Sequence, residues 1–152
     1  MAMVGIIIGS KTDEQFIQTA IDVLKDFQVE YELEILSAHR KPEKVRKYAM
    51  GARDKGFKVI IAAAGSAAHL PGVVASWTTL PVIGIPLPTS DLNGIDSLYS
   101  IVQMPGGVPV ACVGIGHPGA KNAALLACQI LAVKYEDIAK ALEEYKHKLA
   151  EA

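Results

Sequence analysis

The hydrophobic residues of the chain fall mainly into short segments of two kinds. Continuous apolar runs, rich in β-branched residues, occupy residues 3–8, 57–64, 82–86 and 108–115. Such runs are typical of strands that are covered on both faces. Segment 29–36 instead alternates Glu with Tyr, Leu and Ile, which predicts a strand at or near the edge of a sheet.

Between these segments the apolar residues recur with the period of a helix. The first helical pattern begins near Thr12, with Thr12 or Asp13 available as N-cap. The second begins at Pro42, which fits a first helical turn, and continues to Gly56. Later helices are predicted from the loop at 65–72 through Trp77, near 95–103, over 120–133 and over 135–150.

The order of these elements predicts the fold class. Five strands alternating with helices indicate one α/β domain over residues 1–152, a three-layer flavodoxin-like sandwich with a five-stranded parallel sheet and a C-terminal amphipathic helix. In such sheets ligands bind outside the carboxyl ends of the strands. We therefore expect five loops to meet at one rim: 9–10, 37–40, 64–69, 86–93 and 114–119.

Composition and charge limit the kinds of function that the chain could have. Hydrophobic residues make up 51% and charged residues 20%, a balance that favours an oligomer over a small monomer with a fully wetted surface. The net charge of −1 and the absence of long Lys/Arg runs argue against nucleic-acid or membrane partners. No leader or membrane span is recognisable, so we expect a soluble, cytoplasmic protein. Cys112 and Cys128 lack metal or redox spacing and are predicted to be buried free thiols.

The segment Gly9-Ser10-Lys11-Thr12-Asp13 joins the first predicted strand to the first predicted helix. Free N–H groups and the positive dipole end at a helix N-terminus attract anions such as phosphate. A capped turn explains the same residues, so both interpretations stay open. Beside a bound phosphate, Asp13 could also accept hydrogen bonds from ribose hydroxyls.

The segment Ser37-Ala38-His39-Arg40-Lys41-Pro42 places an imidazole beside a guanidinium where a strand gives way to a helix. Arg40 has the rigid fork that suits phosphate, although a surface salt bridge explains it equally well. His39 could move a proton in both directions near neutral pH, but a lone histidine is often structural. The residues alone leave these alternatives open.

Residues 62–68 form an almost entirely apolar stretch of small side chains where a polar loop is expected. Such a segment could let backbone amides approach a flat ligand, or it could serve tight helix–sheet packing. For His69, a buried core position is slightly favoured over a ligand contact. His117 is assigned to a turn and His147 to the solvated surface, and the four histidines lack metal-ligand spacing.

Four motifs carry a resemblance that spans nearly the whole chain. GSKTD at 9–13, SAHRKP at 37–42, GSAAHLPG at 65–72 and DSLYSIVQMPGGVPV at 96–110 closely resemble the N5-carboxyaminoimidazole ribonucleotide mutases of bacterial purine biosynthesis, of the class I type. This resemblance implies a metal-free and cofactor-free rearrangement in which a carboxylate moves from nitrogen to carbon 4 of an imidazole. It also implies a homo-octamer.

The resemblance assigns roles by position. His39 would be the general acid/base, Ser10, Thr12, Ser37 and Arg40 would hold the phosphate, and Asp13 would hold the ribose. The loop 64–70 would cover the base and carboxylate. The implied substrate-binding set is Gly9, Ser10, Thr12, Asp13, Ser37, Ala38, Arg40, Ala64, Gly65, Ser66, Ala67, His69 and Leu70.

One departure and two rivals accompany this assignment. The family commonly shows Gly-Ala-Gly-Gly where this chain has Ala63-Ala64-Gly65-Ser66, which adds a hydroxyl and two Cβ atoms to the pocket loop. The sister carboxylase, which uses free carbon dioxide, typically carries Ser-Asn where Ala67-Ala68 stands here, so the mutase is preferred. A nucleotide- or flavin-binding module without chemistry is the second rival, although few aromatic residues lie near the rim.

Overall fold

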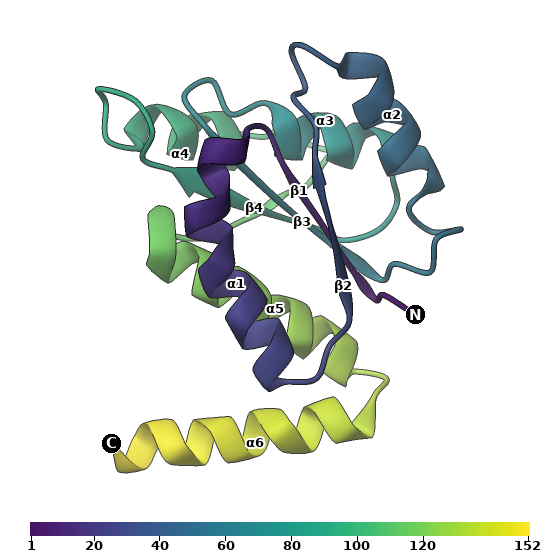
Figure 1. Ribbon diagram of the computed structural model, residues 1–152, viewed down its shortest axis with the longest axis vertical. Helices are drawn as coiled ribbons and strands as arrows, with labels where there is room; N and C mark the ends of the chain where they lie inside the picture. The colour runs from purple at the N-terminus through teal and green to yellow at the C-terminus, as the bar shows by residue number, and fades with distance from the viewer.

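The computed structural model describes residues 1–152 and contains five parallel strands in the order β2-β1-β3-β4-β5 (Figure 1). This is the predicted flavodoxin-like order, and β2 is an edge strand as expected. The strands are β1 (Val4–Ile8), β2 (Tyr31–Ile35), β3 (Val59–Gly65), β4 (Val82–Leu87) and β5 (Ala111–Cys112).

Helices cover both faces of this sheet. Helices α1 and α5 pack on one face, and α2, α3 and α4 pack on the other (Figure 1). Helix α6 lies along the end of this body and contacts α5. No helix has the length and apolar character that a membrane crossing requires. The helical elements are the 3-10 turn η1 (Lys11–Asp13), α1 (Glu14–Asp26), α2 (Pro42–Gly51), α3 (Leu70–Trp77), α4 (Ile95–Val102), α5 (Gly116–Ala132) and α6 (Glu136–Glu151).

The burial of β3 explains why its sequence is a continuous apolar run. Val59, Ile61 and Ala63 face the core under α1 and α5. Their neighbours Ile60 and Ala62 face the second core, under α2 and α3. Because successive side chains of a strand point to opposite faces, a strand covered on both sides must be apolar at every position.

The fifth strand is much shorter than the predicted segment 108–115. Only Ala111 and Cys112 pair with β4, because Pro109 has no N–H for the ladder and the chain then turns into α5. Gly116 has φ 74° in this turn, and α5 begins there rather than at residue 120. His117 therefore lies in the first turn of a helix and not in a loop.

Two smaller predictions also change. Asp13 is the N-cap residue of α1, as predicted, but its side chain makes no cap hydrogen bond there, and Ser10 caps the preceding turn η1. Helix α2 ends at Gly51, before the predicted Gly56. Both cysteines are free as expected, but only Cys128 is fully buried, whereas Cys112 is half-buried. Burial raises the pKa of Cys128 to about 11, which keeps this thiol protonated and unreactive.

Candidate active site

A cavity of about 290 Å³ opens where β1, β2, β3 and β4 end. Wider hollows of about 330 to 560 Å³ lie elsewhere, but none of them is lined by a histidine or an arginine. The first cavity brings together every residue predicted for the site and adds one more, Thr89. Its lining is Gly9, Ser10, Thr12, Asp13, Ser37, Ala38, His39, Arg40, Ala64, Gly65, Ser66, Ala67, His69, Leu70 and Thr89.

The loop after β1 is a capped turn that also presents hydroxyls to the cavity. The Ser10 hydroxyl accepts a hydrogen bond from the Thr12 N–H (3.4 Å) and lies 3.0 Å from the Thr12 hydroxyl. The Ser10 N–H donates to Asp13 Oδ2 at 3.2 Å, which completes a capping box. The two interpretations of this segment are therefore compatible, because the cap holds both hydroxyls at the cavity wall.

Asp13 is the only carboxylate in the cavity lining, and its side chain is buried. Burial raises the pKa of Asp13, and the hydrogen bond from the Ser10 N–H opposes this shift. A carboxylate in this position can accept further hydrogen bonds from neutral donors such as sugar hydroxyls.

The loop after β2 holds Arg40 at the cavity without a protein anion. Its backbone N–H and its Nε–H both donate to the Ser37 hydroxyl, at 3.2 and 3.3 Å. No carboxylate lies within ion-pair distance of Arg40, so the surface salt bridge considered from the sequence is not formed. The terminal guanidinium nitrogens have no hydrogen-bond acceptor in the protein and are free to bind an anion.

Two histidines from different loops meet at this cavity. His39 Nε2 lies 2.7 Å from His69 Nδ1, and the two rings stand nearly perpendicular, at 89°. Both side chains are exposed, so the sequence-based preference for His69 as a core residue is wrong. His69 immediately precedes α3, and this boundary position turns its ring out of the core and toward His39.

Apart from the His69 ring and the Ser66 hydroxyl, the loop after β3 contributes backbone rather than polar side chains. The N–H groups of Ser66, Ala67 and Ala68 donate to no acceptor in the protein. Ser66 has φ 54°, in the left-handed region that favours glycine. Ser66 and Ala67 line the cavity, and their two free N–H groups can bind an oxyanion such as a carboxylate, whereas Ala68 is buried outside the lining.

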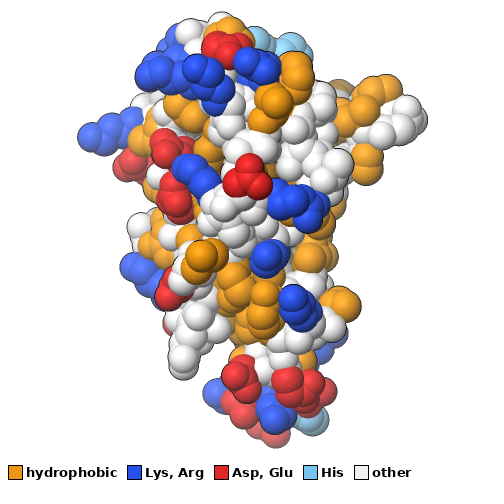
Figure 2. Space-filling view, turned by 90° about the vertical axis from the view of Figure 1, so that its right-hand side faces the viewer, with side chains coloured by type: hydrophobic (Ala, Val, Ile, Leu, Met, Phe, Trp, Pro, Cys, Tyr) orange, Lys and Arg blue, Asp and Glu red, His pale blue; other side chains and the backbone are white.

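The side chains that line the cavity also suit an anionic ligand. The cavity combines one guanidinium and two imidazoles with a single buried carboxylate, and its lining contains no Phe, Tyr or Trp. Figure 2 shows histidine side chains beside a group of Lys and Arg side chains at the upper end of the molecule. A non-aromatic pocket with an unpaired guanidinium favours a phosphorylated ligand with a small ring over a flavin.

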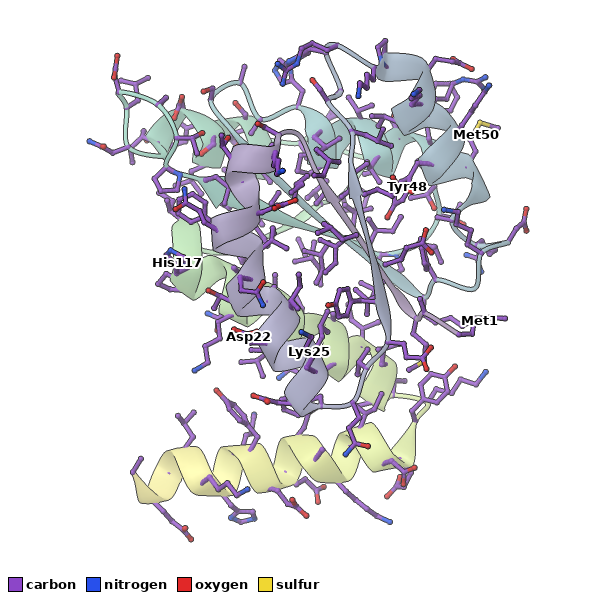
Figure 3. All side chains as sticks on the ribbon, in the orientation of Figure 1. Met1, Asp22, Lys25, Tyr48, Met50 and His117 are labelled. Atoms are coloured by element: carbon purple, nitrogen blue, oxygen red, sulfur yellow. The ribbon has the colours of Figure 1, made fainter.

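The remaining histidines lie outside the cavity. His117 Nδ1 is 3.0 Å from the Thr19 hydroxyl of α1, and its ring packs against Phe16 (Figure 3). His147 is exposed on α6, as predicted. The structure contains no group of three or more His, Cys, Asp or Glu side chains placed to hold a metal ion.

Sequence reasoning missed Thr89. The loop 86–93 was expected at the rim, but no residue within it was singled out. The available signal was a hydroxyl residue soon after a buried strand, in a loop of the carboxyl edge.

The fold and the cavity define a flavodoxin-like α/β protein with a candidate active site at the carboxyl edge of its parallel sheet. More particularly, the chain belongs to the AIR carboxylase family, whose model matches residues 3–152.

Curated relatives are identical to this chain at more than half of the aligned residues. A Thermotoga maritima protein named N5-carboxyaminoimidazole ribonucleotide mutase is 55% identical over 149 residues, which cover 98% of this chain and 86% of that protein. A Bacillus subtilis protein of the same name is 56% identical over 142 residues, which cover 93% and 88%.

Solved structures agree with this placement. The crystal structure of Treponema denticola PurE superimposes with a TM-score of 0.88 at 30% identity, covering 99% of this chain and 93% of that one. A 3-dehydroquinate dehydratase-like protein from Bifidobacterium longum reaches a TM-score of 0.56 at 14% identity, a likeness of fold alone.

Proposed function

We propose that this protein is the mutase of de novo purine biosynthesis that converts N5-carboxyaminoimidazole ribonucleotide to 4-carboxy-5-aminoimidazole ribonucleotide. The observation that carries the proposal is the contact of 2.7 Å between His39 and His69 in the same cavity as an unpaired guanidinium and a loop of free backbone amides. The high identity to proteins named for this activity supports the same conclusion.

The phosphate of the ribonucleotide would lie at the ends of β1 and β2. Ser10 and Thr12 offer hydroxyls there, and Arg40 offers guanidinium N–H groups that no protein anion occupies. Ser37 accepts two hydrogen bonds from Arg40 and so fixes the position of the guanidinium. The buried Asp13 would accept hydrogen bonds from the ribose hydroxyls.

The imidazole ring and its carboxylate would lie at the loop after β3. Ala64, Gly65 and Ala67 present little side-chain bulk, so a flat ring can approach the backbone closely. The free N–H groups of Ser66 and Ala67 would stabilise the carboxylate before and after it moves.

The rearrangement adds one proton to the substrate and later removes one, so no net proton is consumed. His39 as imidazolium protonates the carbamate nitrogen while the carbon–nitrogen bond breaks and carbon dioxide departs. Carbon 4 of the ring attacks this carbon dioxide and forms the new carbon–carbon bond, and the small pocket favours recombination over escape. Neutral His39 then removes the proton from carbon 4, which restores aromaticity and returns the enzyme to its starting charge.

The contact with His69 restricts the protonation of the pair. A hydrogen bond between two ring nitrogens requires one N–H and one lone pair, so the pair accommodates at most one imidazolium while the contact persists. His69 would therefore hold His39 in place and limit this end of the cavity to one imidazolium.

The mutase and the sister carboxylase differ in their source of carbon dioxide. The family description names the carboxylase, whereas the relatives at 55–56% identity are named as mutases, and Ala67-Ala68 lacks the polar pair typical of the carboxylase. Supplying aminoimidazole ribonucleotide at low bicarbonate separates the two. The mutase turns over inefficiently under these conditions, and efficient turnover would identify the carboxylase.

An oligomeric, cytoplasmic enzyme, with a homo-octamer as the family assembly, is part of this proposal. An apolar stripe on and before α4 supports it, because Leu92, Ile95, Tyr99 and Val102 are 61%, 47%, 63% and 47% exposed. A stripe of this kind on a helix is typical of a surface that a second copy covers. Light scattering of the purified protein should give the mass of eight chains, and a monomer would refute the assembly.

The direct test of function is an ultraviolet assay of carboxylate migration on the purified protein. Added N5-carboxyaminoimidazole ribonucleotide should be converted to the 4-carboxy product without metal or cofactor. Absence of conversion by folded protein would refute the proposal.

A further inference from the structure

Thr89 is the one cavity residue that neither the motifs nor the mechanism uses. It lies two residues after β4, and its hydroxyl makes no hydrogen bond within the protein. The side chain packs directly over Gly65, so that a Cβ at Gly65 would collide with the Thr89 hydroxyl and lie 3.0 Å from its Cβ. The hydroxyl therefore occupies the space beside the end of β3 that a side chain at position 65 would fill.

The loop that carries Thr89 is held by a network of hydrogen bonds. The neighbouring Ser90 hydroxyl donates to Asp96 Oδ2 at 2.7 Å and accepts from the Leu92 N–H at 3.1 Å. The buried Ser97 hydroxyl lies 2.9 Å from the Leu87 carbonyl and 3.0 Å from the Gly94 carbonyl. Bonds on both sides of Thr89 fix the backbone that positions it, as a preorganised binding residue requires.

The sheet order places Thr89 at the far end of the cavity from the phosphate groups. The hydroxyls and the guanidinium come from the loops after β1 and β2, and β3 separates these strands from β4. Adjacent strands lie about 4.8 Å apart, so β4 is about 10 Å from β1. A ribonucleotide with one small ring, anchored by its phosphate at β1 and β2, would reach β4 with the outer edge of that ring.

We propose that Thr89 is a substrate-binding residue that hydrogen-bonds the exocyclic groups of the imidazole, namely the amino group and the carboxylate. This inference rests on the proposed function. A hydroxyl can donate to a carboxylate oxygen and accept from an amino N–H, so Thr89 can hold both groups at the ring edge. The free amides of the loop after β3 approach the same carboxylate from the neighbouring strand.

The test compares three variants. Thr89→Val keeps the shape and removes the hydroxyl, Thr89→Ser keeps the hydroxyl, and Thr79→Val makes the same change at an exposed position near the opposite end of β4. Thr89→Val should lower kcat/KM for the ribonucleotide about 10- to 100-fold, the loss expected for a hydrogen bond to a charged group. Thr89→Ser should retain most of the activity, and Thr79→Val should match the wild type.

A binding measurement separates substrate contact from a structural role. Ribose 5-phosphate lacks the imidazole, so its Kd should be unchanged in Thr89→Val, whereas the Kd of the 4-carboxy product should rise about 10-fold or more. Wild-type kinetics of Thr89→Val, or equal weakening of both ligands, would overturn the inference. Wild-type protein that binds ribose 5-phosphate but never moves the carboxylate would instead overturn the proposed function, and this result is obtained before any variant is made.

Discussion

The loop after β2 and the loop after β3 border the same cavity but build it from different parts of the chain. The first presents side chains, an imidazole from His39 and a guanidinium from Arg40. The second adds one imidazole, from His69, but otherwise presents small residues and the free backbone N–H groups of Ser66 and Ala67. Charged side chains suit a phosphate that must be held and a proton that must move, whereas free amides suit a carboxylate that changes position.

Because one loop supplies mainly side chains and the other mainly backbone, different mutations remove their contributions to the site. A single substitution removes the chemical group that the first loop supplies. Apart from the His69 ring, the second loop loses its contribution only when its backbone path changes. This path depends on Gly65 under Thr89 and on Ser66 at φ 54°. Large kinetic effects are therefore expected from the first loop and small structural effects from the second.

The largest effect is expected from His39→Asn. In the proposed mechanism His39 protonates nitrogen and deprotonates carbon 4. Asn keeps a polar side chain but cannot move these protons, so kcat should fall about 10²- to 10⁴-fold while the product still binds. The ultraviolet assay and a product-binding titration measure the two quantities. His147→Asn, on the exposed face of α6, is the matched control and should leave both unchanged. Substantial turnover by His39→Asn would remove His39 from the proton transfer.

Arg40→Ala should act on binding rather than on chemistry. Loss of the unpaired guanidinium should raise KM about 10- to 100-fold, with a smaller change in kcat, because the proposed phosphate contact would be made both before and during the reaction. Arg46→Ala is the control, since Arg46 lies on the same side of the molecule in an exposed ion pair with Glu43 (2.6 Å) and does not line the cavity. An equal rise in KM in both variants would show that substrate binding depends on the overall positive charge of this surface and not on a specific contact with Arg40.

Asp13→Asn should separate stability from function. The folded state raises the pKa of Asp13, so ionisation of this buried carboxyl opposes folding as the pH rises through that pKa. Asn is neutral and can still accept from the Ser10 N–H, so the variant should match the wild-type Tm below about pH 3 and exceed it near neutrality.

The same variant should bind the ribonucleotide several-fold more weakly, because an amide is a poorer acceptor for ribose hydroxyls than a carboxylate. Thermal unfolding across pH and a binding titration measure the two effects. A lower Tm at neutral pH would mean that the capping box outweighs the burial of the charge.

The smallest effect is expected from Ser66→Gly. Glycine removes the cost of a left-handed Cβ, roughly 1–2 kcal/mol, but loses about 0.5–1 kcal/mol through greater freedom of the unfolded chain. The net gain of about 0.5 kcal/mol should raise the Tm by about 1–2 °C. Gln28→Gly, at φ 55° outside the cavity, should give a similar gain without altering kcat, and a fall in Tm for Ser66→Gly would show that the hydroxyl stabilises the loop.

The apolar pattern predicted most of the fold because most strands are buried in a regular way. The continuous runs of β1 and β3 are covered on both faces, and the alternating β2 lies at an edge. The fifth strand is shorter than predicted because Pro109 and Gly116 limit its backbone pairing. The hydropathy of a segment contains no information about such limits. Patterns of this kind report burial but not hydrogen-bond partners.

The residues that line the cavity could be predicted from the motifs, but the contacts between them could not. The motifs indicated which loops meet, but the distance between His39 and His69 depends on the sheet order that brings residues 30 positions apart into contact. His69 was assigned to the core because an isolated histidine beside an apolar helix gives no sign of which way its ring turns. Thr89 was missed because its role depends on its position over Gly65.

The most direct test of the central claim follows the carbon of the substrate. N5-carboxyaminoimidazole ribonucleotide labelled with carbon-13 in its carbamate carbon is converted by the enzyme in excess unlabelled bicarbonate, and the product is analysed by mass spectrometry. Transfer within the cavity predicts that nearly all product carries the label at its new carboxylate. Product diluted to the isotopic content of the bicarbonate pool would contradict the account.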